Sequence, residues 1–257
     1  MAGVEQLVVV NQTELAKGIF QMTLQGQLVS QLKAGQFLHL LVPDSSRLLR
    51  RPLSIAKINR QRHHVTLIYR VEGQGTKIFS QLKQGATLSV MGPQGNGFDT
   101  DFLKKRQKVL LVGGGIGTPP LLALAEDLAR KGMEIRTVLG FSNKEAVILV
   151  DDFLKFGRVD VSTDDGSYGT KGTVSKIIES FDASWSAVYA CGSKGMLTYI
   201  DRRFADHPHA YLSTESRMAC GMGACYACVV HLKNQDHAAS LRVCEDGPVF
   251  KTGRIVL

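Results

Sequence analysis

Four cysteines near the C-terminus have the spacing of an iron–sulfur site. Cys220, Cys225 and Cys228 follow the pattern Cys-x4-Cys-x2-Cys, and Cys244 completes the set further along the chain. The same spacing is typical of plant-type [2Fe-2S] loops, in which four thiolates hold two sulfide-bridged iron atoms. The residues between the first three cysteines are mostly glycine and alanine, and these leave room for backbone N–H groups to point at the sulfurs. The pattern therefore predicts a two-iron cluster that moves one electron at a time.

Two other kinds of metal site use similar ligands. A structural zinc site usually has two Cys-x2-Cys pairs, and this segment has one, Cys225 with Cys228. His231 and His237 lie nearby and could replace thiolates, as in Rieske centres. Because four cysteines are available, we interpret both histidines as surface residues. The sequence favours an iron–sulfur cluster, and a non-catalytic, zinc-stabilised binding module is the alternative from another class of protein.

A second chemical motif, Arg51-Pro52-Leu53-Ser54, stands at the end of a predicted strand. The Arg51 guanidinium has a fork of N–H donors that suits a pyrophosphate, and Pro52 stiffens the backbone. Ser54 can hydrogen-bond the polar edge of a flavin ring. Taken alone, the tetrapeptide is also compatible with an ordinary barrel strand.

Two further stretches follow this motif along the chain. Tyr69 and Arg70 end a predicted strand, and we expect Thr76 to be the N-cap of a helix that starts at residue 77, so that free amides face a phosphate. In this order and spacing the three stretches resemble the flavin barrel of the ferredoxin-NADP reductase superfamily. The resemblance implies that FAD is bound by the following residues: Arg51, Pro52, Leu53, Ser54, Ile68, Tyr69, Arg70, Gly75 and Thr76.

A glycine-rich turn, "GGGIGTPP", follows the predicted strand at residues 108–112. Thr118 stands where the Rossmann fingerprint has its third glycine, and no clear acidic ribose ligand ends the next strand, so the motif is weak alone. We expect Thr118 to cap the following helix, with proline in its first turn. Gly-Gly-x-Gly-x-x-Pro resembles the nicotinamide dinucleotide domain of the same superfamily. This resemblance implies that NAD is bound by Gly113, Gly114, Gly115, Gly117 and Thr118.

The stretch "YACGS" adds Cys191 and Gly192 to the predicted NAD site. Both stand at the carboxyl end of a predicted strand, where ligands of open α/β sheets bind. We interpret Cys191 as a residue near the hydride-transfer position, and a buried structural thiol is the alternative. Residues 164–167, Asp-Asp-Gly-Ser, are expected to form a turn at a strand end, which either faces the nucleotide or is a plain Asx turn.

The elements that must position these residues change in character along the chain. From residue 5 to 98, six short alternating or β-branched runs predict a six-stranded antiparallel barrel, the FAD-binding domain at 1–100. Strands and helices then alternate, which predicts a doubly wound parallel sheet, the NAD-binding domain at 101–208. Residues 209–257 are too few for an apolar core of their own and form the predicted [2Fe-2S] subdomain.

Composition limits the classes of function. The 257 residues are 44% hydrophobic and 21% charged, which is ordinary for a globular protein, and no apolar run is long enough to span a membrane. The net charge of +8 comes from scattered residues, so we expect anionic ligands or an acidic partner rather than nucleic acid. The N-terminal residues do not resemble a secretory leader. We therefore expect a cytoplasmic protein whose cysteines bind metal rather than form disulfides.

The order of these parts resembles one family, together with "GPQGNGF" at 92–98 and "STDDGSYGTKGTV" at 162–174. This family is the electron-transfer subunit of B-type, NAD-dependent dihydroorotate dehydrogenase. The resemblance implies FAD, one [2Fe-2S] cluster, and a separate FMN-containing catalytic subunit in a heterotetramer of two copies of each. Electrons would pass from FMN through the cluster and FAD to NAD+ in pyrimidine biosynthesis. An alternative with the same domain organisation is an NAD(P)H-linked flavin reductase subunit of a hydrogenase or a sulfur-reducing complex.

Overall fold

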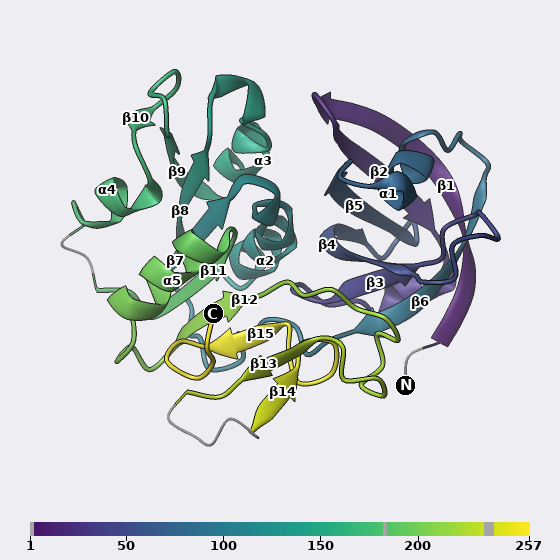
Figure 1. Ribbon diagram of the computed structural model, residues 1–257. Coiled ribbons are helices and arrows are strands. Elements are labelled where there is room, and N and C mark those ends of the chain that lie inside the picture. Colours follow the sequence, from purple (N-terminus) through teal and green to yellow (C-terminus); the bar gives the residue numbers. More distant parts are fainter. Residues whose placement is uncertain (1–2, 182–183, 234–238) are drawn as a thin grey trace.

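The computed structural model describes residues 3–181, 184–233 and 239–257. Figure 1 shows a barrel and an α/β unit side by side, with the cysteine-rich segment below both. His237 lies outside the described residues. None of the helices in the described part of the chain is long and apolar enough to cross a membrane.

The first hundred residues form a closed antiparallel barrel, as predicted. Its strands lie in the order β1-β2-β5-β4-β3-β6. Alternation along each strand places one set of side chains, such as Leu7, Met22 and Leu67, in a fully buried interior. The barrel elements, with a 3-10 turn and one helix, are β1 (Gly3–Ala16), β2 (Ile19–Gln25), η1 (Gln27–Gln31), β3 (Phe37–Leu40), β4 (Arg51–Asn59), β5 (His64–Arg70), α1 (Gln74–Ser80) and β6 (Thr87–Gln94).

The second unit is a twisted sheet with the order β10-β9-β8-β7-β11-β12-β15. Neighbouring strands are parallel except for β15, which is antiparallel to β12. The doubly wound parallel sheet is thus confirmed, with one antiparallel edge strand. Its strands are β7 (Lys108–Gly114), β8 (Glu134–Phe141), β9 (Gly157–Thr163), β10 (Thr170–Lys171), β11 (Ala187–Cys191), β12 (Ala210–Ser213) and β15 (Val249–Lys251).

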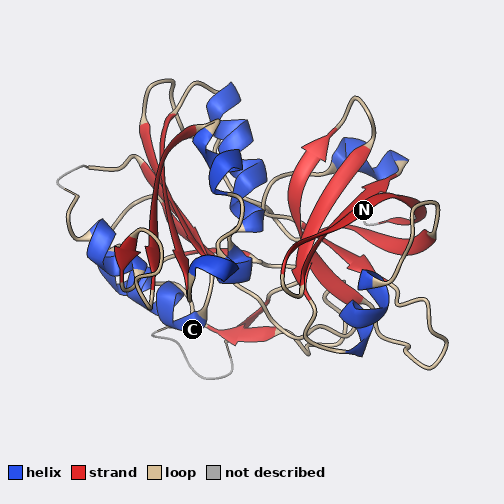
Figure 2. Cartoon of the chain, turned by 90° about the horizontal axis from the view of Figure 1, so that it is seen from above, coloured by secondary structure: helices blue, strands red, loops and turns tan. Residues whose placement is uncertain are grey.

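Helices cover both faces of this sheet (Figure 2). Alternate strand residues point to opposite faces, so Val109 and Leu111 pack against α2, whereas Leu110 and Val112 pack against α4 and α5. The core under α2 continues into the barrel through Ala56 and Ile68, so the barrel and the sheet share one apolar interface. The helices and 3-10 turns are η2 (Gly115–Gly117), α2 (Pro119–Arg130), η3 (Lys144–Ala146), α3 (Val150–Leu154), α4 (Val174–Ile178) and α5 (Lys194–Arg203).

The C-terminal segment is shared between the sheet and the cysteine loop. It contributes β12 and β15 to the sheet, and β13 (Val229–His231) and β14 (Ser240–Arg242) form a separate antiparallel pair. Phe37 of β3 packs with Cys228, Cys244 and Phe250 in one buried cluster. The boundaries expected at residues 100 and 208 stay predictions, and the sheet itself extends past the second one.

Candidate functional site

A cavity of about 700 Å³ lies at the mouth of the barrel; we call it the barrel cavity. The residues predicted to bind FAD come from β4, β5 and the first turn of α1, which lie at this end of the barrel. All of them line the cavity: Arg51, Pro52, Leu53, Ser54, Ile68, Tyr69, Arg70, Gly75 and Thr76. Phe37, Arg50 and Met218 also line it and were not predicted.

The start of α1 differs from the prediction in one respect. The helix begins at Gln74 with Gly73 as its N-cap, so Thr76 is the third helical residue and not the cap. The Thr76 hydroxyl oxygen accepts hydrogen bonds from the amides of Glu72 and Gly73, at 3.1 and 3.2 Å. Gly75 packs closely against Arg51, because a Cβ there would lie 2.9 Å from Nε of Arg51. Arg51 therefore lies over the first turn of α1, where helix amides lack intrahelical partners.

A second cavity of about 590 Å³ lies at the carboxyl ends of the parallel strands; we call it the sheet cavity. Four of the glycines predicted to bind NAD line it: Gly114, Gly115, Gly117 and Gly192. A Cβ on Gly117 would lie 2.5 Å from Cα of Gly192, so the two glycine turns touch. Among the predicted NAD residues, Gly113, Thr118 and Cys191 do not line this cavity.

Thr118 and Cys191 are buried beside the cavity rather than exposed in it. Thr118 has helical backbone angles that continue from η2. Among the residues that the structure describes, its side chain makes no capping hydrogen bond and its buried hydroxyl has no partner. Thr118 thus occupies the predicted N-cap position, with proline in the first turn of α2, but its side chain does not supply the capping hydrogen bond. The Cys191 side chain is 2% exposed, and burial, with the charge of Glu215 as a smaller cause, raises the pKa of its thiol to about 12. This burial favours the alternative interpretation, in which Cys191 is a neutral structural thiol. A role of Cys191 near the hydride-transfer position stays a prediction.

The turn at residues 164–167 follows β9. Asp164 lines the sheet cavity, and a carboxylate oxygen of Asp165 accepts hydrogen bonds from the amide and hydroxyl of Ser167, at 2.9 and 2.7 Å. Both interpretations of this turn therefore have a structural basis, because it is an Asx turn and its first residue faces the cavity.

The two cavities meet at a small set of residues. Arg70, Ile116 and Glu215 line both of them. A Cβ on Gly115 would lie 3.8 Å from Nη2 of Arg70, so this barrel side chain reaches the glycine turn of the sheet. Glu215 is exposed at the cavity surface, and the protein around it, with the charge of Glu72, acts to raise the pKa of its carboxyl, which Arg70 opposes. Glu215 follows β12 without a recognisable motif, so sequence patterns alone do not identify it.

The four predicted cluster ligands lie on one loop and on the turn after β14. Cys225 is exposed and Cys220 half-buried, whereas Cys228 and Cys244 are buried, at 2% and 1% exposed. Backbone amides point at three of the sulfurs. Met222 donates to Cys220 Sγ at 3.4 Å, Gly223 to Cys244 Sγ at 3.2 Å, and Cys244 to Cys228 Sγ at 3.5 Å. These contacts are the amide–sulfur interactions that the small residues in the loop predict.

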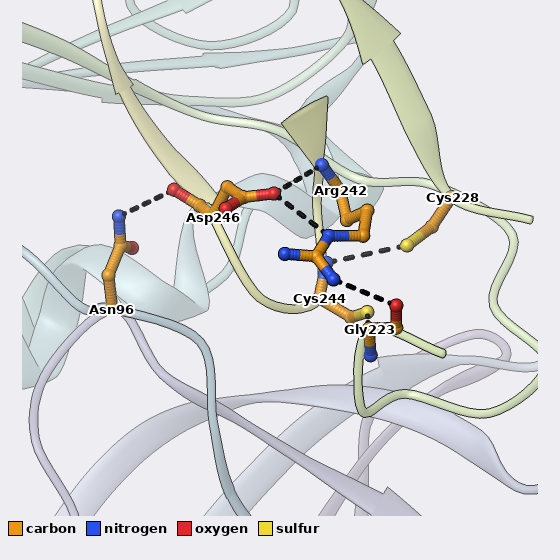
Figure 3. A network of polar contacts seen from close by, with 6 residues as sticks. All are labelled: Asn96, Gly223, Cys228, Arg242, Cys244 and Asp246. Atoms are coloured by element: carbon orange, nitrogen blue, oxygen red, sulfur yellow. Dashed lines mark hydrogen bonds and ion pairs between the residues drawn. The ribbon is translucent and has the colours of Figure 1, made fainter. Parts of the chain in front are cut away.

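An arginine holds the loop against the turn that carries the fourth cysteine (Figure 3). Arg242 donates through Nη1 to the carbonyl of Gly223 at 2.9 Å and through Nε to Asp246 at 3.2 Å. The Asp246 carboxylate also accepts the amide of Arg242 at 2.7 Å. Asn96 of the barrel donates to the Asp246 carbonyl at 3.1 Å, so the turn is also attached to the barrel.

The thiols differ in acidity because their surroundings differ. Burial acts to raise the pKa of Cys220, but hydrogen bonds from the Met222 amide and from Cys225 outweigh it and lower the pKa to about 7. Burial and the neighbouring Cys228 raise the pKa of Cys244 to about 12. Thiolates at all four positions would repel one another without a cation, so the group is suited to metal rather than to free thiolates.

The donor set fits a two-iron cluster in its chemistry. It offers four cysteine sulfurs and amide donors aimed at them. Across residues 3–181, 184–233 and 239–257, no three histidine, cysteine or carboxylate side chains gather closely enough to hold a single metal ion. His231, which the sequence places on the surface, is exposed.

The barrel, the sheet and the cavity between them define a flavin- and nicotinamide-linked reductase fold with an added cysteine loop. Residues 6–98 match the family described as the oxidoreductase FAD-binding domain. Residues 215–256 match the iron–sulfur cluster binding domain of dihydroorotate dehydrogenase B. A solved NADH-dependent reduced ferredoxin-NADP oxidoreductase is similar over 100% of this chain and 91% of its own, with a TM-score of 0.86 and 28% identity. Phthalate dioxygenase reductase shares the fold, with a TM-score of 0.66 and 18% identity over 90% of this chain and 87% of its own.

Relatives in sequence specify the family. The dihydroorotate dehydrogenase B (NAD(+)) electron transfer subunit of Streptococcus mutans is 60% identical over 98% of both chains. Its counterpart in Geobacillus thermodenitrificans is 46% identical over the whole of both chains. The chain belongs to the family of dihydroorotate dehydrogenase B (NAD(+)) electron transfer subunits.

Proposed function

We propose that this chain carries electrons from dihydroorotate oxidation to NAD+ in pyrimidine biosynthesis. In this proposal FAD occupies the barrel cavity, NAD the sheet cavity, and a [2Fe-2S] cluster is held by Cys220, Cys225, Cys228 and Cys244. A separate catalytic subunit oxidises dihydroorotate to orotate. We further propose that this partner holds FMN and that two copies of each subunit form a heterotetramer.

The observation that carries this proposal is the position of the barrel cavity between the other two sites. On one side it shares Arg70, Ile116 and Glu215 with the sheet cavity. On the other side Phe37 lines it and also packs in the buried cluster that contains Cys228 and Cys244. A redox group in the barrel cavity would thus have the cluster on one side and the dinucleotide on the other.

The cofactors supply the redox chemistry, since a two-iron cluster moves single electrons and a flavin converts single electrons to hydride. The protein supplies binding and orientation. Arg51 and the first turn of α1 provide donors for a pyrophosphate, and Ser54 provides a hydrogen-bonding group at the cavity wall. The glycines of the two sheet turns allow a dinucleotide to approach the backbone closely.

The experiment that tests this division of labour compares the purified chain with its complex. We expect the chain alone to pass electrons from NADH to an artificial acceptor and to leave dihydroorotate unchanged. Addition of the co-purified companion subunit is expected to restore NAD+ reduction by dihydroorotate. Oxidation of dihydroorotate by the chain alone would contradict the proposal, and a hydrogenase or sulfur-reducing companion would favour the alternative redox complex.

We also propose that the protein acts in the cytoplasm. All five cysteines are free thiols in the described structure, and thiols of this kind persist in a reducing compartment. Fractionation of native cells followed by immunodetection of the chain tests this location.

A further inference from the structure

A fully buried histidine lies between the barrel and the cysteine loop. The side chain of His39 on β3 is 0% exposed. Its neighbours Leu38 and Leu40 belong to the barrel core, so His39 points to the outer face of the strand. Within the described residues neither ring nitrogen has a partner at full hydrogen-bonding distance and angle, although the backbones of Arg50 and Cys220 lie near the ring. Burial of a polar ring without well-formed hydrogen bonds costs folding free energy, so the contacts of this ring with its neighbours indicate its role.

The imidazole packs directly against Gly221 of the cysteine loop. A Cβ on Gly221 would overlap Nδ1 of His39 and would lie 2.7 Å from Cε1 and 3.2 Å from Cγ. Gly221 also has a left-handed backbone, with φ +71°. Only glycine combines this backbone with so close an approach. The ring therefore limits where the chain can run immediately after Cys220.

The two amides that follow Gly221 are among the three that point at the predicted cluster sulfurs. Met222 N–H donates to Cys220 Sγ and Gly223 N–H to Cys244 Sγ. Their directions depend on the backbone at Gly221, because each peptide plane is set by the dihedral angles before it. Hydrogen bonds to the sulfurs help to set the reduction potential of a cluster. They stabilise the reduced form, which carries more negative charge.

We propose that His39 is a positioning residue for the cluster, whose ring holds Gly221 so that the next two amides point at the sulfurs and keep the reduction potential high. The inference rests on the proposed [2Fe-2S] cluster. The same strand also serves the flavin site, since His39 pairs with Pro52 of β4, which lines the barrel cavity. β3 thus links the flavin motif and the cluster loop.

Three variants of the full chain, purified with its cofactors, test this role. His39→Ala removes the ring, and His39→Phe keeps a ring of similar width. Leu40→Ala is the matched control, because Leu40 is equally buried on the same strand but faces the barrel core. The measurements are iron and FAD per chain, the midpoint potential of the cluster, and the electron paramagnetic resonance (EPR) spectrum of the reduced cluster.

We expect His39→Ala to shift the cluster potential to a more negative value and to change the EPR spectrum while FAD content stays at the wild-type level. His39→Phe and Leu40→Ala are expected to keep the wild-type potential. Loss of iron from His39→Ala, with FAD retained and iron restored in His39→Phe, would also support the proposal. An unchanged potential and spectrum in iron-loaded His39→Ala would overturn it.

Gly221→Ala tests the same contact from the loop side if His39→Ala does not fold. The added methyl overlaps the ring, so we expect a changed cluster potential or loss of iron with FAD retained. Wild-type iron content and potential in Gly221→Ala would overturn the inference. Absence of iron from the wild-type chain after anaerobic reconstitution would contradict the proposed function itself, and this inference with it.

Discussion

The amide nitrogen of Gly223 lies 3.2 Å from the sulfur of Cys244, although the two residues belong to different segments of the C-terminal region. The carbonyl of the same glycine accepts a hydrogen bond from Arg242. One residue thus connects the loop of the first three cysteines to the turn that carries the fourth. We therefore expect this connection, as well as the spacing in the sequence, to bring the four thiols together around a cluster.

Substitution of Arg242 by alanine is expected to loosen the cysteine loop, because it removes the donors to Gly223 and Asp246. A hydrogen bond to a charged group contributes about 1.5 kcal/mol, so we expect iron to be lost roughly tenfold faster in the presence of a chelator. Absorbance of the cluster over time measures the loss. Arg242→Lys keeps the positive charge without the forked guanidinium donors, so we expect an intermediate rate of iron loss. Equal rates in all three proteins would contradict this role of Arg242.

Cysteine variants separate the predicted ligands from the fifth cysteine. Cys225→Ser is expected to abolish or severely deplete the cluster, because it removes one of four thiolates. Cys191→Ser is expected to leave iron content near the wild-type value, since Cys191 packs in the core under the sheet. Iron analysis of both purified proteins tests the assignment. Equal iron loss in the two variants would show that Cys191 has been assigned to the wrong role.

Arg51→Ala is expected to weaken FAD binding, because Arg51 lines the barrel cavity and lies over the first turn of α1. Loss of a hydrogen bond to a charged phosphate costs about 1.5–3 kcal/mol, which corresponds to roughly 10- to 100-fold in Kd. Fluorescence titration of the deflavinated protein with FAD measures this Kd. Arg47→Ala is the control, since Arg47 pairs with Asp44 and does not line either cavity. Equal FAD affinity in the Arg51 variant and the control would contradict the assignment.

The contact between the barrel and α3 predicts a pH dependence of stability. Asp152 lies 3.0 Å from Nζ of Lys57. Burial acts to raise its pKa, but hydrogen bonds from Lys57 and Lys155 and their charges lower it below the usual value. A lowered pKa in the folded state means that the carboxylate stabilises the fold above the ordinary aspartate pKa of about 3.9. This contribution is lost as the pH falls through the lower, folded-state pKa.

Asp152→Asn should remove that pH-dependent contribution. Both partners are partly exposed, so we expect a destabilisation of less than about 1 kcal/mol at pH 7. Thermal unfolding of the wild type and the variant at pH 7 and at acidic pH is the measurement. The difference in Tm between them should be present at pH 7 and should shrink as the pH falls. A difference that grows towards acidic pH would contradict stabilisation by the ionised carboxylate.

Much of the fold could be predicted because it depends on local patterns. Alternation of apolar residues identified all six barrel strands, and the turn "GGGIGTPP" identified the junction of β7 and α2. The helix caps were less predictable. Thr76 and Thr118 have residue types that favour N-caps, but the first helix starts earlier, at Gln74. Thr118 does occupy the N-cap position of α2, yet its backbone continues from the 3-10 turn η2 and, in the described structure, its side chain makes no capping hydrogen bond. Each start depends on the conformation of the preceding loop.

The unpredicted parts of the site depend on contacts between distant segments. Glu215 and Phe37 carry no motif, and they become site residues because the fold places them where two cavities or two clusters meet. His39 has the appearance of an ordinary strand residue, and its contact with Gly221 exists only once the cysteine loop covers β3. The position of β15 at the sheet edge likewise follows from tertiary pairing with β12.

Anaerobic titration of the purified chain with NADH tests the central claim most directly, because it monitors the flavin and the cluster together. We expect a coloured protein with FAD and two irons per chain, in which NADH bleaches the flavin absorbance and produces the EPR signal of one reduced two-iron cluster. A colourless protein that lacks iron and FAD after anaerobic reconstitution would contradict the account. So would a cluster that NADH leaves oxidised while dithionite reduces it.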